Sequence, residues 1–123
     1  MMKVIAIDFD GTITNEPEAG PTMSLRDNCQ EAIKLLYDLE YILILNTCRE
    51  GTELEKALEF LYQNQLLCRF SYINENHWER INYYGNDCRK ISADYYIDDK
   101  IIGGFPGWEE VIKYFKTISH QSI

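Results

Sequence analysis

The chain has 123 residues, of which 46% are hydrophobic and 26% are charged, and its formal net charge at pH 7 is −8. This length excludes two ordinary domains, and the composition excludes a low-complexity or disordered chain. The acidic balance argues against extended nucleic-acid binding, because contacts to a phosphate backbone need clustered lysine and arginine. We therefore expect a single domain over residues 1–123.

The spacing of the cysteines and the lengths of the apolar runs indicate the cellular compartment of the protein. The four cysteines show no CxxC spacing, and the apolar run near the N-terminus meets an acidic residue too early for a signal peptide. No apolar run reaches the length that spans a membrane. We expect a cytoplasmic protein with reduced thiols and no membrane partner, and the sequence leaves open whether the chain forms a homo-oligomer.

Four short runs rich in β-branched and aromatic residues predict strands. The first run, KVIAID, lacks the alternation of a half-exposed strand, which is typical of a strand covered on both faces. The four runs lie at residues 3–8, 41–46, 70–74 and 93–98.

Three other segments place apolar residues at helical spacing. A helix is expected over 24–39 behind a Ser24 cap, and another begins near Thr52, where Thr52 and Glu55 form a capping-box pattern. The last helix carries the apolar residues from Trp108 to Phe115. The rest is expected to be a loop at 13–23, at most a short helix within 75–87, and a frayed tail at 117–123.

Strands that alternate with helices predict an α/β fold. We expect a doubly wound, mostly parallel, Rossmann-like sheet with helices on both faces. In such folds ligands bind outside the carboxyl ends of the strands. The polar residues at those ends are Asp8 and Asp10 after the first strand, Asn46, Thr47 and Arg49 after the second, Asn74 and Glu75 after the third, and Asp98 and Asp99 after the fourth.

Four of these residues are carboxylates from two distant segments, Asp8 and Asp10 from one and Asp98 and Asp99 from the other. Carboxylates held close together repel one another, so they need a cation or a shared proton. A donor set of oxygen atoms without histidine suits Mg²⁺, which commonly also binds phosphate oxygens. The sequence therefore predicts a magnesium site that receives a phosphorylated substrate.

At this point the chain resembles the haloacid dehalogenase (HAD) superfamily of aspartate-nucleophile phosphatases. The resemblance rests on four motifs in order: DFDGT at 8–12, a hydrophobic strand leading into Thr47, Lys90, and YIDD at 96–99. Together they span nearly the whole chain. The stretches TCRE and RKISADYYIDDK are similar to those of small bacterial and phage HAD-like hydrolases of largely unassigned substrate.

The resemblance implies catalytic roles for four residues. Asp8 would attack phosphorus and become an aspartyl-phosphate, and Asp10 would protonate the leaving oxygen and later accept a proton from water. Thr47 would donate a hydrogen bond to the phosphoryl group. Lys90 would neutralise charge on Asp8 and on the phosphoryl oxygens.

The resemblance also implies a set of metal ligands. Asp8, the backbone carbonyl of Asp10 and one acid of the pair Asp98 and Asp99 would hold Mg²⁺. The sequence does not decide which member of the pair binds directly, although we favour Asp99.

Segment lengths leave no room for a cap domain over the site. Only 11 residues separate Thr12 from Ser24, and the 42 residues between Thr47 and Lys90 already hold a helix and a strand. We therefore expect a capless HAD-like fold. Its site would be covered by a large substrate, by another subunit or by its own loops.

Each motif also has a plain structural interpretation when it stands alone. Asp8 and Asp10 could belong to an ordinary strand-to-turn junction, and Thr47 could be a loop residue. Lys90 could be an ordinary surface residue, and Arg49 could either bind substrate phosphate or be structural.

The leading functional hypothesis is a Mg²⁺-dependent phosphatase, a hydrolase that acts on a phosphomonoester. One alternative is a HAD-like scaffold that binds Mg²⁺ or a phosphorylated partner with little turnover. Another is a receiver-like signalling module, which expects its phosphorylated aspartate on the third strand, where this chain has Asn74. The sequence leaves the substrate open.

Overall fold

The sheet of this protein consists of four parallel strands. The computed structural model describes residues 1–15 and 23–121. The order in the sheet is β3-β2-β1-β4, and the central β1 pairs with β2 and with β4. All four predicted strands are present, each shorter than expected, and the α/β class with a parallel sheet is confirmed. The strands are β1 (Val4–Ile7), β2 (Ile42–Leu45), β3 (Tyr72–Ile73) and β4 (Tyr95–Ile97).

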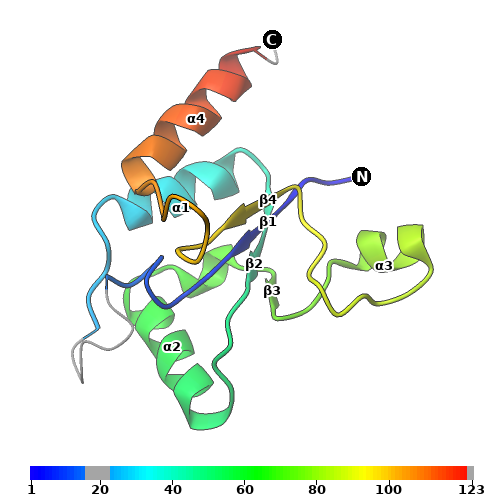
Figure 1. Cartoon of the computed structure of the whole chain (residues 1–123), viewed down its shortest axis with the longest axis horizontal. Helices are drawn as coiled ribbons and strands as arrows, with labels where there is room; N and C mark the ends of the chain where they lie inside the picture. Colours follow the sequence, from blue (N-terminus) through cyan, green and yellow to red (C-terminus); the bar gives the residue numbers. More distant parts are fainter. Residues whose placement is uncertain (16–22, 122–123) are drawn as a thin grey trace.

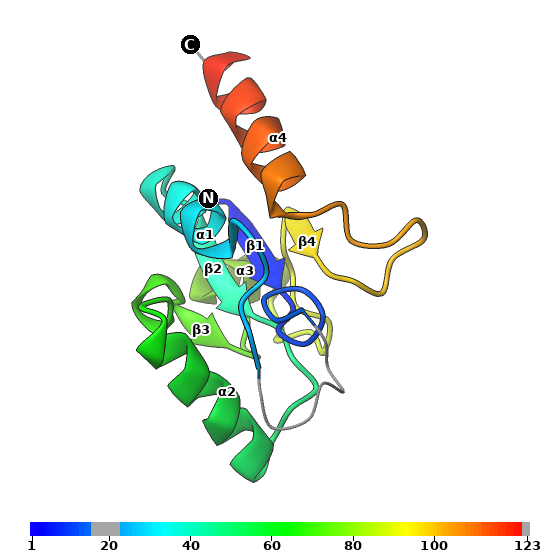
Figure 2. The same ribbon diagram turned by 90° about the vertical axis from the view of Figure 1, so that its left-hand side faces the viewer.

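The helices lie on both sides of this sheet. Figure 1 shows α1 and α2 on one side of the strands and α3 on the other, and Figure 2 shows α1 and α2 in front of the sheet with α3 behind it. Helix α4 packs against α1. The elements are α1 (Cys29–Asp38), α2 (Gly51–Gln63), a 3₁₀ turn η1 (Leu67–Arg69), α3 (Trp78–Tyr84) and α4 (Trp108–Gln121).

The two faces of the sheet are covered unequally. Because side chains alternate along a strand, Ile5 and Ile7 point to the face where α1, α2 and α4 build the larger core. Val4 and Ala6 point to the opposite face, where Ile91 from the irregular chain before β4 closes a smaller core. The prediction of helices on both faces therefore holds in outline, but the second face depends on irregular chain as well as on the short α3.

One predicted helix start is wrong, and a second helix begins next to its expected start near Thr52 but without the predicted cap. Helix α1 begins at Cys29 rather than near Ser24, because the chain before it pairs with the loop after β1, where Thr14 bridges Leu25. Helix α2 begins at Gly51 with no side-chain cap, so the capping box of Thr52 and Glu55 is not formed as a helix start.

The predicted frayed tail at 117–123 is also corrected. Helix α4 continues to Gln121, so residues 117–121 are helical, and residues 122–123 lie outside the described residues. The short helix expected within 75–87 is α3. Of the loop expected at 13–23, residues 16–22 lie outside the described part of the chain. Within the described residues, no helix has both the length and the apolar character needed to cross a membrane.

Trp108 ties the start of α4 to the loop that follows β1. Its side chain is 1% exposed, and its indole Nε1 donates a hydrogen bond of 2.8 Å to the carbonyl oxygen of Thr12. We expect Trp108→Phe to lower the free energy of unfolding by about 2 kcal/mol, because it leaves that buried carbonyl without its donor and reduces packing. Urea unfolding followed by far-UV circular dichroism measures this. The matched control is Trp78→Phe, since Trp78 is 59% exposed, and equal losses in the two variants would contradict the role of Trp108.

Candidate functional site

The ladder between β1 and β4 brings three carboxylates together at the carboxyl edge of the sheet. The backbone N–H of Asp8 donates to the carbonyl of Ile97 at 2.9 Å, which sets Asp8 beside the residues that follow β4. One carboxylate oxygen from each of Asp8, Asp98 and Asp99 lies within 4.8 Å of the other two. The predicted convergence of acids from two distant segments is therefore present for these three residues.

Proximity changes the acidity of two of these groups in opposite directions. The pKa of Asp8 is raised to about 7, most strongly by burial and also by a hydrogen bond to Asp99 and by the charges of Asp98 and Asp99. Burial also acts to raise the pKa of Asp99, but the hydrogen bond with Asp8 and the charge of Lys100 outweigh it and lower that pKa. Asp8 and Asp99 therefore share a proton near neutral pH, which relieves their repulsion.

Asp99 and Asp98 direct their oxygens differently. Asp98 Oδ1 accepts a hydrogen bond of 2.8 Å from the backbone N–H of Lys100, within its own turn. Asp99 Oδ1 is buried and has no hydrogen-bond partner among the described residues. Buried acceptors without a donor are rare and costly, and a cation satisfies them. The all-oxygen donor set and this orphaned oxygen fit Mg²⁺, and they favour Asp99 over Asp98 as the direct ligand.

A glycine allows Asp99 to reach the site. Gly11 has a φ of +79°, and a Cβ atom built on it would lie 2.2 Å from Asp99 Oδ2. Any side chain at position 11 would therefore meet the Asp99 carboxylate.

Hydrogen bonds donated from within the loop after β1 and from Arg26 hold this loop in place. The Phe9 carbonyl accepts backbone N–H groups from Thr12, Ile13 and Thr14 at 3.0–3.3 Å. The Thr12 hydroxyl donates to Asp8 Oδ2 at 3.2 Å, and Arg26 Nε donates to the Gly11 carbonyl at 2.8 Å. The role of Thr12 was visible only as part of the DFDGT motif, and nothing in the sequence indicated Arg26.

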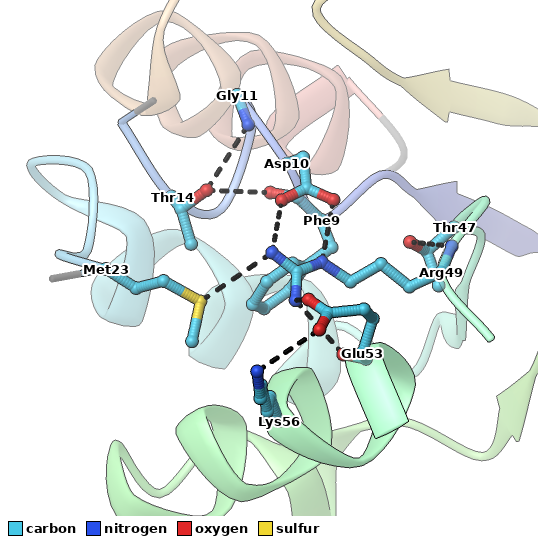
Figure 3. A network of polar contacts seen from close by, with 9 residues as sticks. All are labelled: Phe9, Asp10, Gly11, Thr14, Met23, Thr47, Arg49, Glu53 and Lys56. Carbon is cyan, nitrogen blue, oxygen red and sulfur yellow. Dashed lines mark hydrogen bonds and ion pairs between the residues drawn. The ribbon is translucent and has the colours of Figure 1, made fainter. Parts of the chain in front are cut away.

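Asp10 lies outside the carboxylate triplet and faces Arg49 instead. Arg49 Nε and Nη2 donate to the two Asp10 oxygens at 2.9 and 2.8 Å, a two-bond ion pair that Figure 3 shows. This hydrogen bond to Asp10 is the largest cause of the raised pKa of Arg49. The metal contact predicted for Asp10 uses its backbone carbonyl, and it stays a prediction.

Thr47 is held at the end of β2 by two backbone hydrogen bonds. Its N–H donates to Asn74 Oδ1 at 2.8 Å, and its hydroxyl oxygen accepts the Arg49 N–H at 3.2 Å. The hydroxyl hydrogen remains available to a ligand, as its predicted role requires. Asn74 was identified only as a polar residue at a strand end, and its contact with Thr47 was not expected.

Lys90 lies over the ring of Tyr96, with its Nζ 5.0 Å from the ring centroid. Tyr96 pairs with Ala6, two residues before Asp8, so strand alternation places Lys90 on the Asp8 side of the sheet. Across residues 1–15 and 23–121 Lys90 forms no ion pair, and its contact with Asp8 stays a prediction.

Comparison with known proteins gives one informative likeness. No protein-family model and no curated protein matches the chain. A solved structure, described as that of a conserved protein coded by a locus from Bacteroides thetaiotaomicron, matches with a TM-score of 0.79 and 32% sequence identity over 95% of this chain and 92% of that one. The likeness extends over nearly the whole fold described above.

The acidity of Asp8 predicts how stability depends on pH in the metal-free protein. Its pKa rises from 3.8 to about 7 on folding, so the folded state holds a proton that the unfolded chain releases between these values. Stability should therefore fall as pH rises through this window and level off above it. We expect Asp8→Asn to reduce this fall by about 1–2 kcal/mol after allowance for solvent screening.

Urea unfolding at several pH values from 4.5 to about 8 measures the effect, the upper end lying just above the folded pKa of about 7. Asp27→Asn is the matched control, because Asp27 is exposed. Parallel pH profiles for wild type and Asp8→Asn would contradict the shared proton.

Replacement of Gly11 should disturb Asp99 directly. Gly11→Ala adds a Cβ that meets Asp99, whereas Gly85→Ala meets nothing within 4 Å at a similar φ of +74°. We expect Gly85→Ala to cost about 1 kcal/mol of backbone strain. Gly11→Ala should cost more. Mg²⁺ is expected to raise the Tm of the wild type if it binds the triplet, and Gly11→Ala should remove that rise. Thermal melts with and without Mg²⁺ test this, and an unchanged Mg²⁺ response in Gly11→Ala would contradict it.

Proposed function

We propose that this protein is a Mg²⁺-dependent phosphomonoester hydrolase that works through an aspartyl-phosphate, as its HAD-like motifs imply. The chain belongs to the same family as the conserved Bacteroides thetaiotaomicron protein. One observation carries the proposal. Three carboxylates from two strand ends meet within 4.8 Å, with a buried Asp99 oxygen that has no partner among the described residues. A cation can replace the shared proton in such a cluster and also satisfy the Asp99 oxygen, and bound Mg²⁺ would supply positive charge for phosphoryl oxygens.

The proposed reaction has two displacements at phosphorus. In the first, an Asp8 oxygen bonds to phosphorus, the bond from phosphorus to the leaving oxygen breaks, and Asp10 gives its proton to that oxygen. In the second, water attacks phosphorus, the bond to Asp8 breaks, and Asp10 takes a proton from the water. The products are an alcohol and inorganic phosphate, and Asp10 ends protonated as it began. Splitting hydrolysis in this way replaces one difficult step by two easier ones.

The other residues of the site orient the groups that react. The Thr47 hydroxyl oxygen accepts the Arg49 N–H, so its hydrogen can be donated to a phosphoryl oxygen, and Thr12 holds one Asp8 oxygen. Lys90 is exposed and lies on the Asp8 side of the sheet, and in the proposed reaction it would approach the charge that develops there. These groups provide the positioning and electrostatic stabilisation on which phosphoryl transfer mainly depends.

The residue at the end of the third strand argues against a receiver-like signalling module. That function needs a phosphorylatable aspartate at the end of the third strand. Here β3 ends before Asn74, whose side chain is engaged with Thr47. The acid at the end of the first strand, Asp8, is the better candidate for phosphorylation.

Phosphate release tests the proposed function. Wild type should release phosphate from a generic aryl phosphate, or from members of a small panel of phosphometabolites, with Mg²⁺ but not with a chelator. Asp8→Asn should lose at least about 10³-fold in turnover, because it removes the nucleophile. Inorganic phosphate is measured by a colorimetric assay.

The control is Asp27→Asn, which removes an exposed carboxylate and should leave turnover unchanged. Activity retained in Asp8→Asn would overturn the nucleophile assignment. Folded wild type that binds Mg²⁺ but releases no phosphate from any substrate would favour a binding scaffold over a hydrolase.

A further inference from the structure

Asn76 is a buried polar side chain whose hydrogen bonds reach a segment more than ten residues further along the chain. It is the third residue after β3 and is 5% exposed. Its Nδ2 donates to Asp87 Oδ1 and to the carbonyl of Cys88, both at 2.9 Å, and its Oδ1 accepts the backbone N–H of Ser92 at 2.7 Å. One side chain therefore ties the end of β3 to residues 87–93, which we call the lysine segment.

Tyr96 on β4 holds the same segment from the side of the sheet. Its hydroxyl donates to the carbonyl of Ile91 and accepts the backbone N–H of Ala93 at 3.3 Å. Its ring centroid lies 5.0 Å from Nζ of Lys90. The backbone on both sides of Lys90 is therefore held by hydrogen bonds, although the lysine itself is exposed.

The lysine segment lies on the face of the sheet to which Asp8 points. Ile91 packs with Ala6 in the smaller core, and Tyr96 pairs with Ala6 in the register of β1 and β4. Because side chains alternate along a strand, Ala6 and Asp8 point to the same face. Lys90 is therefore carried on the side of the sheet where the proposed phosphoryl transfer takes place.

The chain after β3 supports two of the predicted catalytic groups. Asn74 accepts the backbone N–H of Thr47, and Asn76, two residues later, holds the lysine segment. An amide suits this buried place because it donates and accepts at the same time, whereas an aspartate of the same shape cannot donate. Loss of the amide would leave buried backbone groups unpaired, so the segment would not keep its conformation.

We propose that Asn76 is a positioning residue, which fixes the lysine segment so that the Lys90 ammonium can reach the phosphoryl group of the substrate. The inference rests on the proposed function. Asn76 acts through Lys90 and touches neither the substrate nor the metal. Without Asn76 the segment gains conformational freedom, and the ammonium spends less time near the charge that it offsets.

The test uses Lys90 as the readout. Wild type, Asn76→Ala, Lys90→Ala and the double variant are assayed with Mg²⁺ on a generic aryl phosphate, or on the phosphometabolite that the wild type hydrolyses best. We expect Lys90→Ala to lose about 10²-fold in kcat/KM, because a charge that stabilises the transition state is gone. Asn76→Ala should lose about 10-fold through misplacement of that charge. The double variant should lose no more than Lys90→Ala, because Asn76 then has nothing to position.

An exchange of polarity tests the hydrogen bonds themselves, and it keeps the test informative if Asn76→Ala does not fold. Asn76→Asp retains the acceptor for the Ser92 N–H, but it loses both donors and sets a second carboxylate against Asp87. Adding Asp87→Asn removes this repulsion and lets the amide at position 87 donate to the carboxylate at position 76. We expect the second substitution to recover about 3-fold in kcat/KM, the value of one restored hydrogen bond.

Asn64→Ala is the matched control. Asn64 also donates from Nδ2 to a carbonyl, that of Phe60 at 2.8 Å, but it lies at the C-terminal end of α2, whereas the first turn of that helix is the part that contacts Arg49. It should lower the Tm and leave kcat/KM unchanged. Hydrogen exchange followed by mass spectrometry should be faster in the lysine segment of Asn76→Ala and unchanged there in Asn64→Ala.

The outcomes separate this inference from the proposed function. Additive losses in the double variant, unchanged hydrogen exchange in the lysine segment, or full activity of Asn76→Ala would overturn the positioning role and leave the hydrolase intact. Folded wild type that is inactive on every substrate would overturn the proposed function and this inference together.

Discussion

The hydrogen-bond ladder between β1 and β4 is the constraint on which the site depends. The bond from the Asp8 N–H to the Ile97 carbonyl fixes Asp8 beside Asp98 and Asp99, where both strands leave the sheet. Ile7, the residue just before Asp8, is fully buried, so the end of β1 cannot move away from β4 to relieve the repulsion between the acids. Packing elsewhere in the protein therefore holds like charges together, and a proton or a cation must compensate them.

Phe9 explains why two acids two residues apart have different surroundings. Its ring is fully buried between α2 and the loop, with Phe60 packed edge-on against it and Arg49 over it. Asp8 and Asp10 flank this buried ring, and each has its own set of partners. Asp8 enters the carboxylate triplet, where its pKa rises, and Asp10 meets a guanidinium.

Much of the fold was predictable because buried strands carry a local signal, whereas the start of α1 was not, because it depends on a distant partner. The pairing of Thr14 with Leu25 displaced the expected start of α1. At the site, the sequence predicted where each strand ends, and this was enough to predict that Asp8, Asp98 and Asp99 lie close together. The contacts that hold the site join residues far apart in the sequence: Arg49 and Asp10 are 39 residues apart, and Trp108 and Thr12 are 96 apart. Local sequence patterns cannot predict such long-range contacts.

Charge balance gives an independent reason for a divalent cation at this edge. The triplet shares a proton between Asp8 and Asp99 and so keeps a net negative charge near neutral pH. Of the cations in the described part of the chain, Arg49 is neutralised by Asp10, and Lys100 lies 3.7 Å from Asp99 but has an 81% exposed side chain. A phosphomonoester brings further negative charge to the same place, and exposed lysines such as Lys100 and Lys90 offset this repulsion only weakly. In the proposed hydrolase, substrate binding should therefore require the metal before any chemistry does.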